Sequence, residues 1–234
     1  MNLQRYEQVS QAADFASFRQ GLIDFAHDMD FGLIAGVLAV ERYRAGEKSE
    51  YFAIGNTPPE FLAAAKDPGN AKRDPVHKHV MRNPAPLVYD QRLYVDAGAG
   101  DLWEMQAPFG YRTGIAVSVH MPGYRRFLLG VDREEPMPKD PVKLSRLLAD
   151  LQLLAVHAQD AAARILIPAD VPRLHPRQVE ILRLTMEGKS AWVVGSLLGI
   201  SENTVNYHMK QLFKQLDVSN KSHAVLKAIE LGLL

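Results

Sequence analysis

Residues 188–216 read GKSAWVVGSLLGISENTVNYHMKQLFKQL, and this stretch decides how the C-terminal part of the chain folds. Apolar residues in 190–197 and again in 201–216 recur at the spacing of one helix face. Ser201 is a good N-cap for the second of these helices. The tripeptide LGI at 198–200 leaves room only for a tight turn between them. The stretch therefore predicts a helix-turn-helix arrangement.

The second of these helices has two unlike faces. Its apolar side consists of Val205, Met209, Leu212 and Leu216. Its polar side carries Asn203, Asn206, Tyr207, Lys210 and Lys214. A helix that enters a major groove needs this division, because one side must pack inward while the other reaches base edges and phosphates. The alternative is that this polar side is the solvated face of an ordinary helical domain. Of the two interpretations, we favour a helix that binds DNA.

Further patterns divide the chain around this motif. Two more helices are predicted at 176–187 and 220–231, and a long amphipathic helix at 139–166. Two prolines within 167–172 end the long helix and precede a new pattern, which is typical of a linker. We therefore expect a first domain at 1–167, a linker at 168–173 and a helix-turn-helix domain at 174–234.

Charge is unevenly divided between these parts. The 234 residues carry 27 Lys and Arg and 27 Asp and Glu, so the formal net charge is zero. Residues 171–234 hold 8 basic and 5 acidic side chains, a balance of +3, which leaves 19 basic and 22 acidic side chains, a balance of −3, in the rest. Since +3 is weak evidence alone, the placement of Lys210 and Lys214 on one helix face counts more.

The first part mixes helix and strand patterns. A helix is predicted at 12–29, with Asp14 or Ser10 as its cap. Strands are predicted at 31–40, 50–54, 114–120 and 126–131, the last two as a hairpin around Pro122-Gly123. The fold class is therefore predicted to be α+β, followed by an all-α domain.

Several classes of protein are disfavoured. The absence of cysteine excludes disulfides, Cys-ligated zinc and a thiol nucleophile. No nucleophile elbow, phosphate loop or HExxH motif occurs, so we expect no enzyme. His77 and His79 lack further ligands nearby, so we expect no metal. The N-terminus has no secretory pattern, and the apolar run at 31–40 is too short to span a bilayer, so we expect a cytoplasmic protein with no membrane contact.

The C-terminal tail carries short motifs at fixed positions. They are LHPRQ at 174–178, GKS at 188–190, LGISE at 198–202 and TV at 204–205, followed by His208, Leu216, Asn220-Lys221 and Ala224. With these motifs the tail resembles the DNA-binding domain of LuxR-type regulators. The resemblance implies a four-helix domain that binds double-stranded DNA as a homodimer and reads an inverted repeat, with RNA polymerase as a further candidate partner.

The same resemblance assigns the residues that contact DNA. Asn206, Tyr207 and Lys210 match the base-facing positions of the recognition helix. The full set of candidates is Asn203, Thr204, Asn206, Tyr207, Lys210, Lys214, Lys189 and Lys221.

The first part has its own set of matching positions. They are Pro58, Phe61, Asp74-Pro75, Tyr89, Trp103, Phe109-Gly110, Gly114 and the long helix before the linker. With these positions residues 1–167 resemble the autoinducer-binding domain of quorum-sensing regulators. The resemblance implies an α-β-α sandwich, an antiparallel sheet with helices on both faces, that encloses an acyl-homoserine lactone as its small-molecule effector. We expect part of the long helix to contribute to the dimer contact.

The resemblance also implies a ligand site. Asp74 matches the aspartate that accepts a hydrogen bond from the ligand amide, a charge-assisted bond that is strong in a dry cavity. Asp74 is alternatively a helix N-cap ahead of Pro75, and both roles are compatible. The full set of candidates is Thr57, Phe61, Ala65, Asp74, Tyr89, Trp103, Phe109 and Ser118.

Phe61 departs from the family. The usual residue is a tryptophan whose indole N–H holds the lactone carbonyl, and phenylalanine has no donor. A lost buried hydrogen bond costs about 1–3 kcal/mol. Tyr111, Arg112 and Ser118 are candidates to compensate. The alternative is a regulator of the same type that senses a different small molecule or works without a ligand.

Overall fold

The structure is a computed structural model that describes all residues except 1–2, 42–48, 65–67, 168–171 and 173. The chain forms two compact units, and each is described by itself. The first comprises Met1–Met121 and Arg125–Ile167, and the second contains Pro168–Leu234. Apart from Pro172, the predicted linker lies outside the described residues. None of the described helices combines the length and the apolar character that a bilayer crossing needs.

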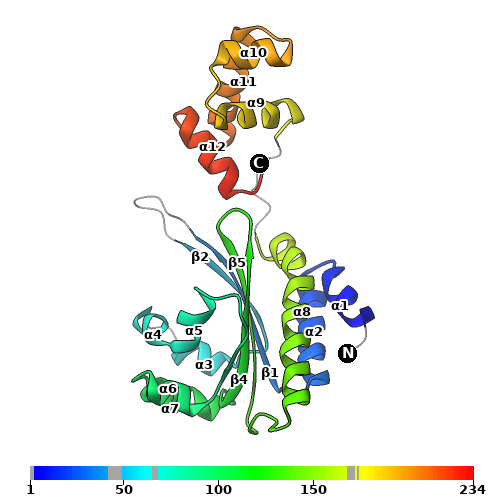
Figure 1. The fold of residues 1–234 in the computed structure, drawn as a ribbon, viewed down its shortest axis with the longest axis vertical. Helices are drawn as coiled ribbons and strands as arrows, with labels where there is room; N and C mark the ends of the chain where they lie inside the picture. The colour runs from blue at the N-terminus through cyan, green and yellow to red at the C-terminus, as the bar shows by residue number, and fades with distance from the viewer. Residues whose placement is uncertain (1–2, 42–48, 65–67, 168–171, 173) are drawn as a thin grey trace. The chain divides into compact units, whose positions relative to one another are not determined.

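The first unit is built on a five-stranded antiparallel sheet (Figure 1). Its strands lie in the order β2 (Glu50–Gly55), β1 (Leu33–Val40), β5 (Arg125–Arg133), β4 (Thr113–Met121) and β3 (Leu87–Tyr89). The predicted hairpin is present, with Thr113 opposite Arg133 and Met121 opposite Arg125. Strand β1 pairs with β5 along its whole length.

Two helices cover one face of this sheet, α2 (Phe15–Asp28) and α8 (Pro141–Leu166), and α1 (Leu3–Ser10) packs against these two helices. Asp14 caps α2 by accepting a hydrogen bond of 2.8 Å from the Ser17 N–H. The strands present large apolar side chains to these helices, and the two layers form the main core. Its largest buried members are Phe18, Leu22, Phe25, Phe31, Ile34, Leu38, Ile115, Phe127, Leu129, Leu151 and Leu154.

Short helices lie on the opposite face: α3 (Pro59–Ala64), α4 (Pro68–Arg73), α5 (Pro75–Val80), α6 (Gln91–Asp96) and α7 (Gly100–Gln106), followed by a single 3₁₀ turn at Ala107–Phe109. A smaller core joins them to the sheet and includes Val80, Tyr89, Tyr94, Leu102, Ala116 and Leu128. Helices on both faces of an antiparallel sheet confirm the predicted α-β-α sandwich.

The sequence predicts short helices that begin near Pro59, Pro75 and Asp101, and these correspond to α3, α5 and α7. Three helices of the first unit were not predicted, α1, α4 and α6. They contain eight, six and six residues, so none gives enough turns for a helical period to stand out from the sequence. Asp90 caps α6, accepting from the Arg92 N–H at 3.0 Å. Such short helices are held by caps and tertiary contacts more than by their own propensity.

The second unit consists of four helices: α9 (Pro176–Met186), α10 (Ala191–Leu198), α11 (Glu202–Gln215) and α12 (Lys221–Glu230). Gly199, with φ of 66°, ends α10 in the left-handed conformation and makes the tight turn into α11. Ser201 caps α11, as predicted, by accepting from the Thr204 N–H at 3.1 Å. The core contains Ile181, Leu182, Val194, Val205, Met209, Leu212, Leu216, Ala224 and Ala228. The predicted all-α helix-turn-helix unit is therefore confirmed.

Gly114 allows an aromatic ring to lie against the sheet. Tyr89 in β3 is paired with Gly114 in β4. A Cβ at position 114 would overlap the Tyr89 ring and would lie 2.6 Å from the Val131 carbonyl oxygen. A glycine here is therefore required by a close approach of ring and backbone.

We predict that Gly114→Ala destabilises the first unit by about 1–3 kcal/mol, because the added methyl group must displace the Tyr89 ring. Denaturant unfolding followed by tyrosine and tryptophan fluorescence measures this change. Gly32→Ala is the matched control, since a Cβ at position 32 would meet nothing within 4 Å. Equal stability of the two variants would show that the ring does not depend on Gly114.

Candidate functional site

The sheet of the first unit has one face with little side-chain volume near its centre. Ala35, Gly130 and Ala116 form a row across β1, β5 and β4, since Gly130 is paired with both alanines. The short helices pack over this row without filling it. A cavity of about 220 Å³ results, lined by Ala35, Val37, Phe61, Asp74, Val76, His77, Val80, Tyr89, Tyr94, Gln106, Tyr111, Ala116, Val117, Leu128, Leu129, Gly130 and Asp132.

Asp74 lies at this cavity and also caps α5. Its Oδ1 accepts from the N–H groups of Val76 at 2.7 Å and His77 at 3.1 Å. The Tyr94 hydroxyl approaches the same oxygen at 3.4 Å. Within the described residues, no donor bonds the other carboxylate oxygen. One oxygen therefore holds the helix in place, while the second is available to a ligand.

A second acidic residue, Asp132, lines the cavity from β5. The Tyr89 hydroxyl donates to its Oδ1 at 2.6 Å. Asp132 is 2% exposed, and burial raises the pKa of its carboxyl from 3.8 to about 7, while the Tyr89 hydrogen bond lowers it and the Asp74 charge raises it. Burial and the neighbouring carboxylate raise the pKa of the Tyr89 hydroxyl well above its usual range. Close to neutral pH, the Asp132 carboxyl can therefore either accept or donate a hydrogen bond.

Asp132 was not predicted from the sequence. The available signal was an aspartate inside the apolar strand FLLGVD at 127–132, where a charge is costly unless it is paired. Its partner Tyr89 was predicted to line the site, but only the strand pairing brings the two together.

An aromatic group lies beside these acids. The ring centroid of Phe61 lies 4.5 Å from that of Tyr111 and 5.7 Å from that of Phe109. Burial raises the pKa of Tyr111 to about 12, against the hydrogen-bonding influence of the Thr57 side chain. Thr57 is therefore near the cavity, and Tyr111 lies next to the position where the family's tryptophan is replaced.

Two buried polar atoms of the cavity lining lack partners. Within the part of the chain that the structure describes, neither Gln106 Nε2 nor the Tyr111 hydroxyl makes a hydrogen bond of standard geometry, although Gln106 lies close enough to Tyr94, and Thr57 to Tyr111, to influence the pKa of each tyrosine. Buried polar groups in folded proteins are nearly always bonded, so such groups in a cavity lining suit a bound molecule that supplies the acceptors. Tyr111 was named from the sequence as a candidate to compensate for Phe61, whereas Gln106 was not predicted, because no pattern marks it.

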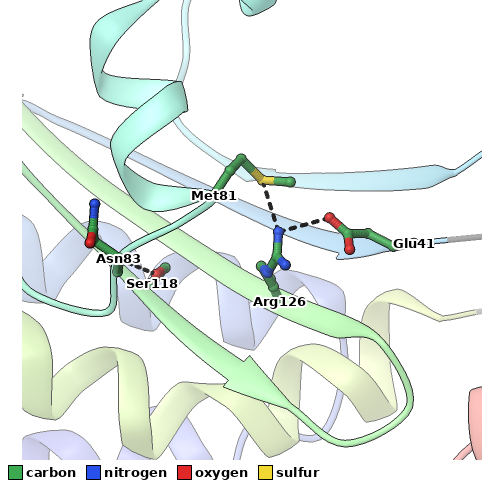
Figure 2. A network of polar contacts seen from close by, with 5 residues as sticks. All are labelled: Glu41, Met81, Asn83, Ser118 and Arg126. Carbon is green, nitrogen blue, oxygen red and sulfur yellow. Dashed lines mark hydrogen bonds and ion pairs between the residues drawn. The ribbon is translucent and has the colours of Figure 1, made fainter.

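Other predicted ligand residues lie apart from the cavity lining. The Trp103 indole N–H donates to the Arg112 carbonyl at 3.1 Å, which fixes the loop between them. The Ser118 hydroxyl donates to the Asn83 carbonyl at 3.0 Å (Figure 2). The side chain of Arg112 is exposed. Ala65 lies outside the described residues.

Figure 2 also shows a polar network between the sheet and α5. Arg126 of β5 forms an ion pair with Glu41 at 2.8 Å, and the same nitrogen lies 3.8 Å from the Met81 sulfur. The side chains of Arg126 and Glu41 are 22% and 13% exposed, so the pair is largely removed from water.

A larger cleft of about 500 Å³ is lined by His27, Asp30, Arg133, Glu134 and Glu135, among others. Its buried guanidinium is already engaged, because Arg133 donates to the Pro136 and Glu135 carbonyls at 2.6 and 3.2 Å. The smaller cavity contains buried polar groups without partners, and is therefore the better candidate for a ligand site.

In the second unit, α11 presents most of the predicted DNA-contacting side chains. Asn203, Lys210 and Lys214 are exposed, Tyr207 is 59% exposed, and Asn206 is half-buried. The Tyr207 hydroxyl accepts from Gln211 Nε2 at 2.6 Å, which orients the ring along the helix. The Thr204 hydroxyl lies 2.8 Å from Ser201 Oγ, so it is engaged at the cap.

The two remaining lysines, Lys189 and Lys221, lie away from α11. Both are exposed, and both line a groove of about 420 Å³ between the end of α9 and the start of α12. These two lysines therefore give the second unit a further exposed basic site, separate from the lysines of α11.

Two protein-family models match the chain. The autoinducer binding domain matches residues 14–162, and the luxR family of bacterial regulatory proteins matches residues 172–228. The second match covers all of the exposed α11 side chains described above.

Individual relatives agree with these matches. The HTH-type quorum sensing-dependent transcriptional regulator RpaR of Rhodopseudomonas palustris is 30% identical over 166 residues, which cover 69% of this chain and 66% of RpaR. The regulatory protein SdiA of Escherichia coli is 30% identical over 168 residues, which cover 69% of this chain and 67% of SdiA. The matched segment thus spans about two thirds of the length of these relatives.

A solved structure shows the same fold. SdiA in complex with octanoyl-rac-glycerol aligns with a TM-score of 0.77 at 22% identity, over 98% of this chain and 93% of that chain. The relatives are regulators of transcription and not enzymes. Because the autoinducer-binding model alone matches more than half of its residues, the chain belongs to the LuxR family of regulatory proteins that carry an autoinducer-binding domain.

Proposed function

We propose that the chain is a ligand-responsive transcription regulator of the quorum-sensing type. A small molecule binds in the cavity of the first unit, and a dimer of the chain binds an inverted repeat with one α11 helix in each major groove. The observation that carries this proposal is a cavity with two unpartnered buried donors in a chain whose other unit exposes a polar helix face.

The ligand in this proposal is an N-acyl-homoserine lactone or a related molecule. The free carboxylate oxygen of Asp74 suits a ligand amide N–H, and Gln106 Nε2 and the Tyr111 hydroxyl suit ligand carbonyls. Bound ligand would order the first unit and so set whether the dimer can place both recognition helices one helical turn apart.

A second candidate is a regulator that senses a molecule without a lactone or needs no ligand. Phe61 favours it, since this side chain cannot donate to a lactone carbonyl. The relative SdiA has been solved in complex with octanoyl-rac-glycerol, whose head group is a glycerol and not a lactone. A screen of both ligand classes separates the two candidates.

The proposed dimer contact uses α8. This helix exposes three apolar side chains, Val142 at 67%, Leu153 at 42% and Val156 at 44%. Exposed apolar residues on one long helix suit a protein interface.

We predict that Lys210→Ala weakens DNA binding and lowers the slope of log affinity against log salt by about one per protomer, because one phosphate-neutralising charge is lost. Fluorescence anisotropy over a salt series measures this effect on a duplex that the wild-type chain has selected from a random pool. Lys72→Ala removes an exposed charge from α4, away from the proposed dimer contact on α8, and is the matched control. Unchanged binding by the double variant Asn206→Ala/Lys210→Ala would contradict the assigned interface.

We predict that Asp74→Asn keeps the α5 cap, since asparagine also caps helices well, but loses most of the ligand-induced rise in melting temperature. Thermal unfolding with a panel of N-acyl-homoserine lactones measures this rise. Asp90→Asn is the control, because Asp90 caps α6 in the same way and does not line the cavity. An equal loss in both variants would assign the effect to capping alone, and no response of the wild-type chain to any lactone would favour the second candidate.

A further inference from the structure

The cavity has two chemically different ends, set by the strand register. At one end, Tyr89, Gly114, Asp132 and Leu33 lie in one row across four strands. The next row contains Ala116, Gly130 and Ala35, and the row after that contains Ser118, Leu128 and Val37. The lining therefore changes from polar at Asp132 to apolar at Leu128, Val37 and Val80.

The next row along the same sheet face is charged. Because side chains on one face recur at every second position, Arg126 follows Leu128 on β5. It is paired with Ala39 of β1 in the sheet, and its side chain reaches Glu41 and Met81 (Figure 2). Arg126 therefore joins the sheet to the end of α5, one row beyond Leu128 and Val37, the last residues of the sheet that line the cavity at this end.

We propose that the ion pair of Arg126 and Glu41, together with Met81, closes the apolar end of the ligand cavity and restricts the ligand to a short acyl or similarly compact apolar group. This inference rests on the proposed function, since it concerns the same cavity. It adds an upper limit to the ligand's length and assigns that limit to three side chains.

The size of the cavity agrees with this limit. A dry cavity of about 150 Å³ holds one benzene molecule. The cavity here, at about 220 Å³, has room for a molecule about half as large again. This is also below the range of roughly 300–1,000 Å³ that holds drug-sized ligands. A polar head group with a short chain fits within this volume, whereas a long acyl chain exceeds it.

The chemistry of the barrier makes it selective. A long alkyl chain would have to separate Arg126 from Glu41, and the largely buried Arg126 guanidinium would then lose this ion pair. The Ser118 hydroxyl bonds the Asn83 carbonyl beside this pair, so that side of the cavity end is also occupied by a satisfied polar contact. An apolar chain gains nothing against these groups.

The test replaces the ion pair by apolar side chains in the full-length chain, as Glu41→Leu/Arg126→Ala. Removing both charges together avoids an unpaired buried charge, and such replacements are often neutral for stability. The control is Asp96→Leu/Arg92→Ala, which removes an exposed pair on α6. Each protein is titrated with butanoyl, octanoyl and dodecanoyl members of two probe series, N-acyl-homoserine lactones and 1-acyl-rac-glycerols, by thermal shift and calorimetry.

In the wild-type chain and the control, the butanoyl probe of at least one series should bind more tightly than the dodecanoyl probe. In the double variant the order should reverse, with the dodecanoyl probe gaining about tenfold or more in affinity, because the added methylenes become buried. If the double variant does not fold, Met81→Ala shortens the same wall with the charges still paired, and the octanoyl probe should gain over the butanoyl probe.

Two results would overturn the proposed barrier while leaving the proposed function intact. One is tight binding of dodecanoyl probes by the wild-type chain, and the other is an unchanged length preference in both folded variants. If no probe binds to any of the proteins, both the proposed barrier and the ligand binding in the proposed function are overturned.

Discussion

The sheet of the first unit is covered by helices on both faces, and the volumes of its side chains decide what each face can hold. Large residues such as Ile34, Phe127 and Leu129 fill the space under α2 and α8 completely. Ala35, Gly130 and Ala116 leave space on the other face. Since protein interiors are otherwise close-packed, this row of small residues is what allows the first unit to contain a ligand.

Much of this architecture was predictable because long periodic segments carry their own signal. Helices α2, α8 and α11 and the β4–β5 hairpin appear where the patterns placed them. The small helices α1, α4 and α6 were missed, since segments of this length are set by caps and neighbours. At the candidate site, Asp74 precedes a proline at a helix start and was found. Asp132 and Gln106 were not, because their importance depends on which strands and helices become neighbours.

The second unit shows why an average charge says little about a protein of this kind. The neutral total combines an acidic first part with a basic tail, and the basic side chains Lys210 and Lys214 share one exposed face of α11. The opposite face of that helix is buried through Val205, Met209 and Leu212. Affinity for a polyanion depends on such local placement, which the total charge of the chain does not reveal.

Asp132 couples the folding of the first unit to proton uptake. Burial beside Tyr89 raises the pKa of its carboxyl from 3.8 to about 7. Between these two pH values, the folded unit therefore keeps a proton that the unfolded chain has released. Because the folded pKa is the higher one, this contribution to stability is complete below about pH 4 and is lost as the pH rises through about 7. At this residue the first unit is therefore loosened as the pH rises from acid to neutral, whereas paired carboxylates usually lose stability as the pH falls.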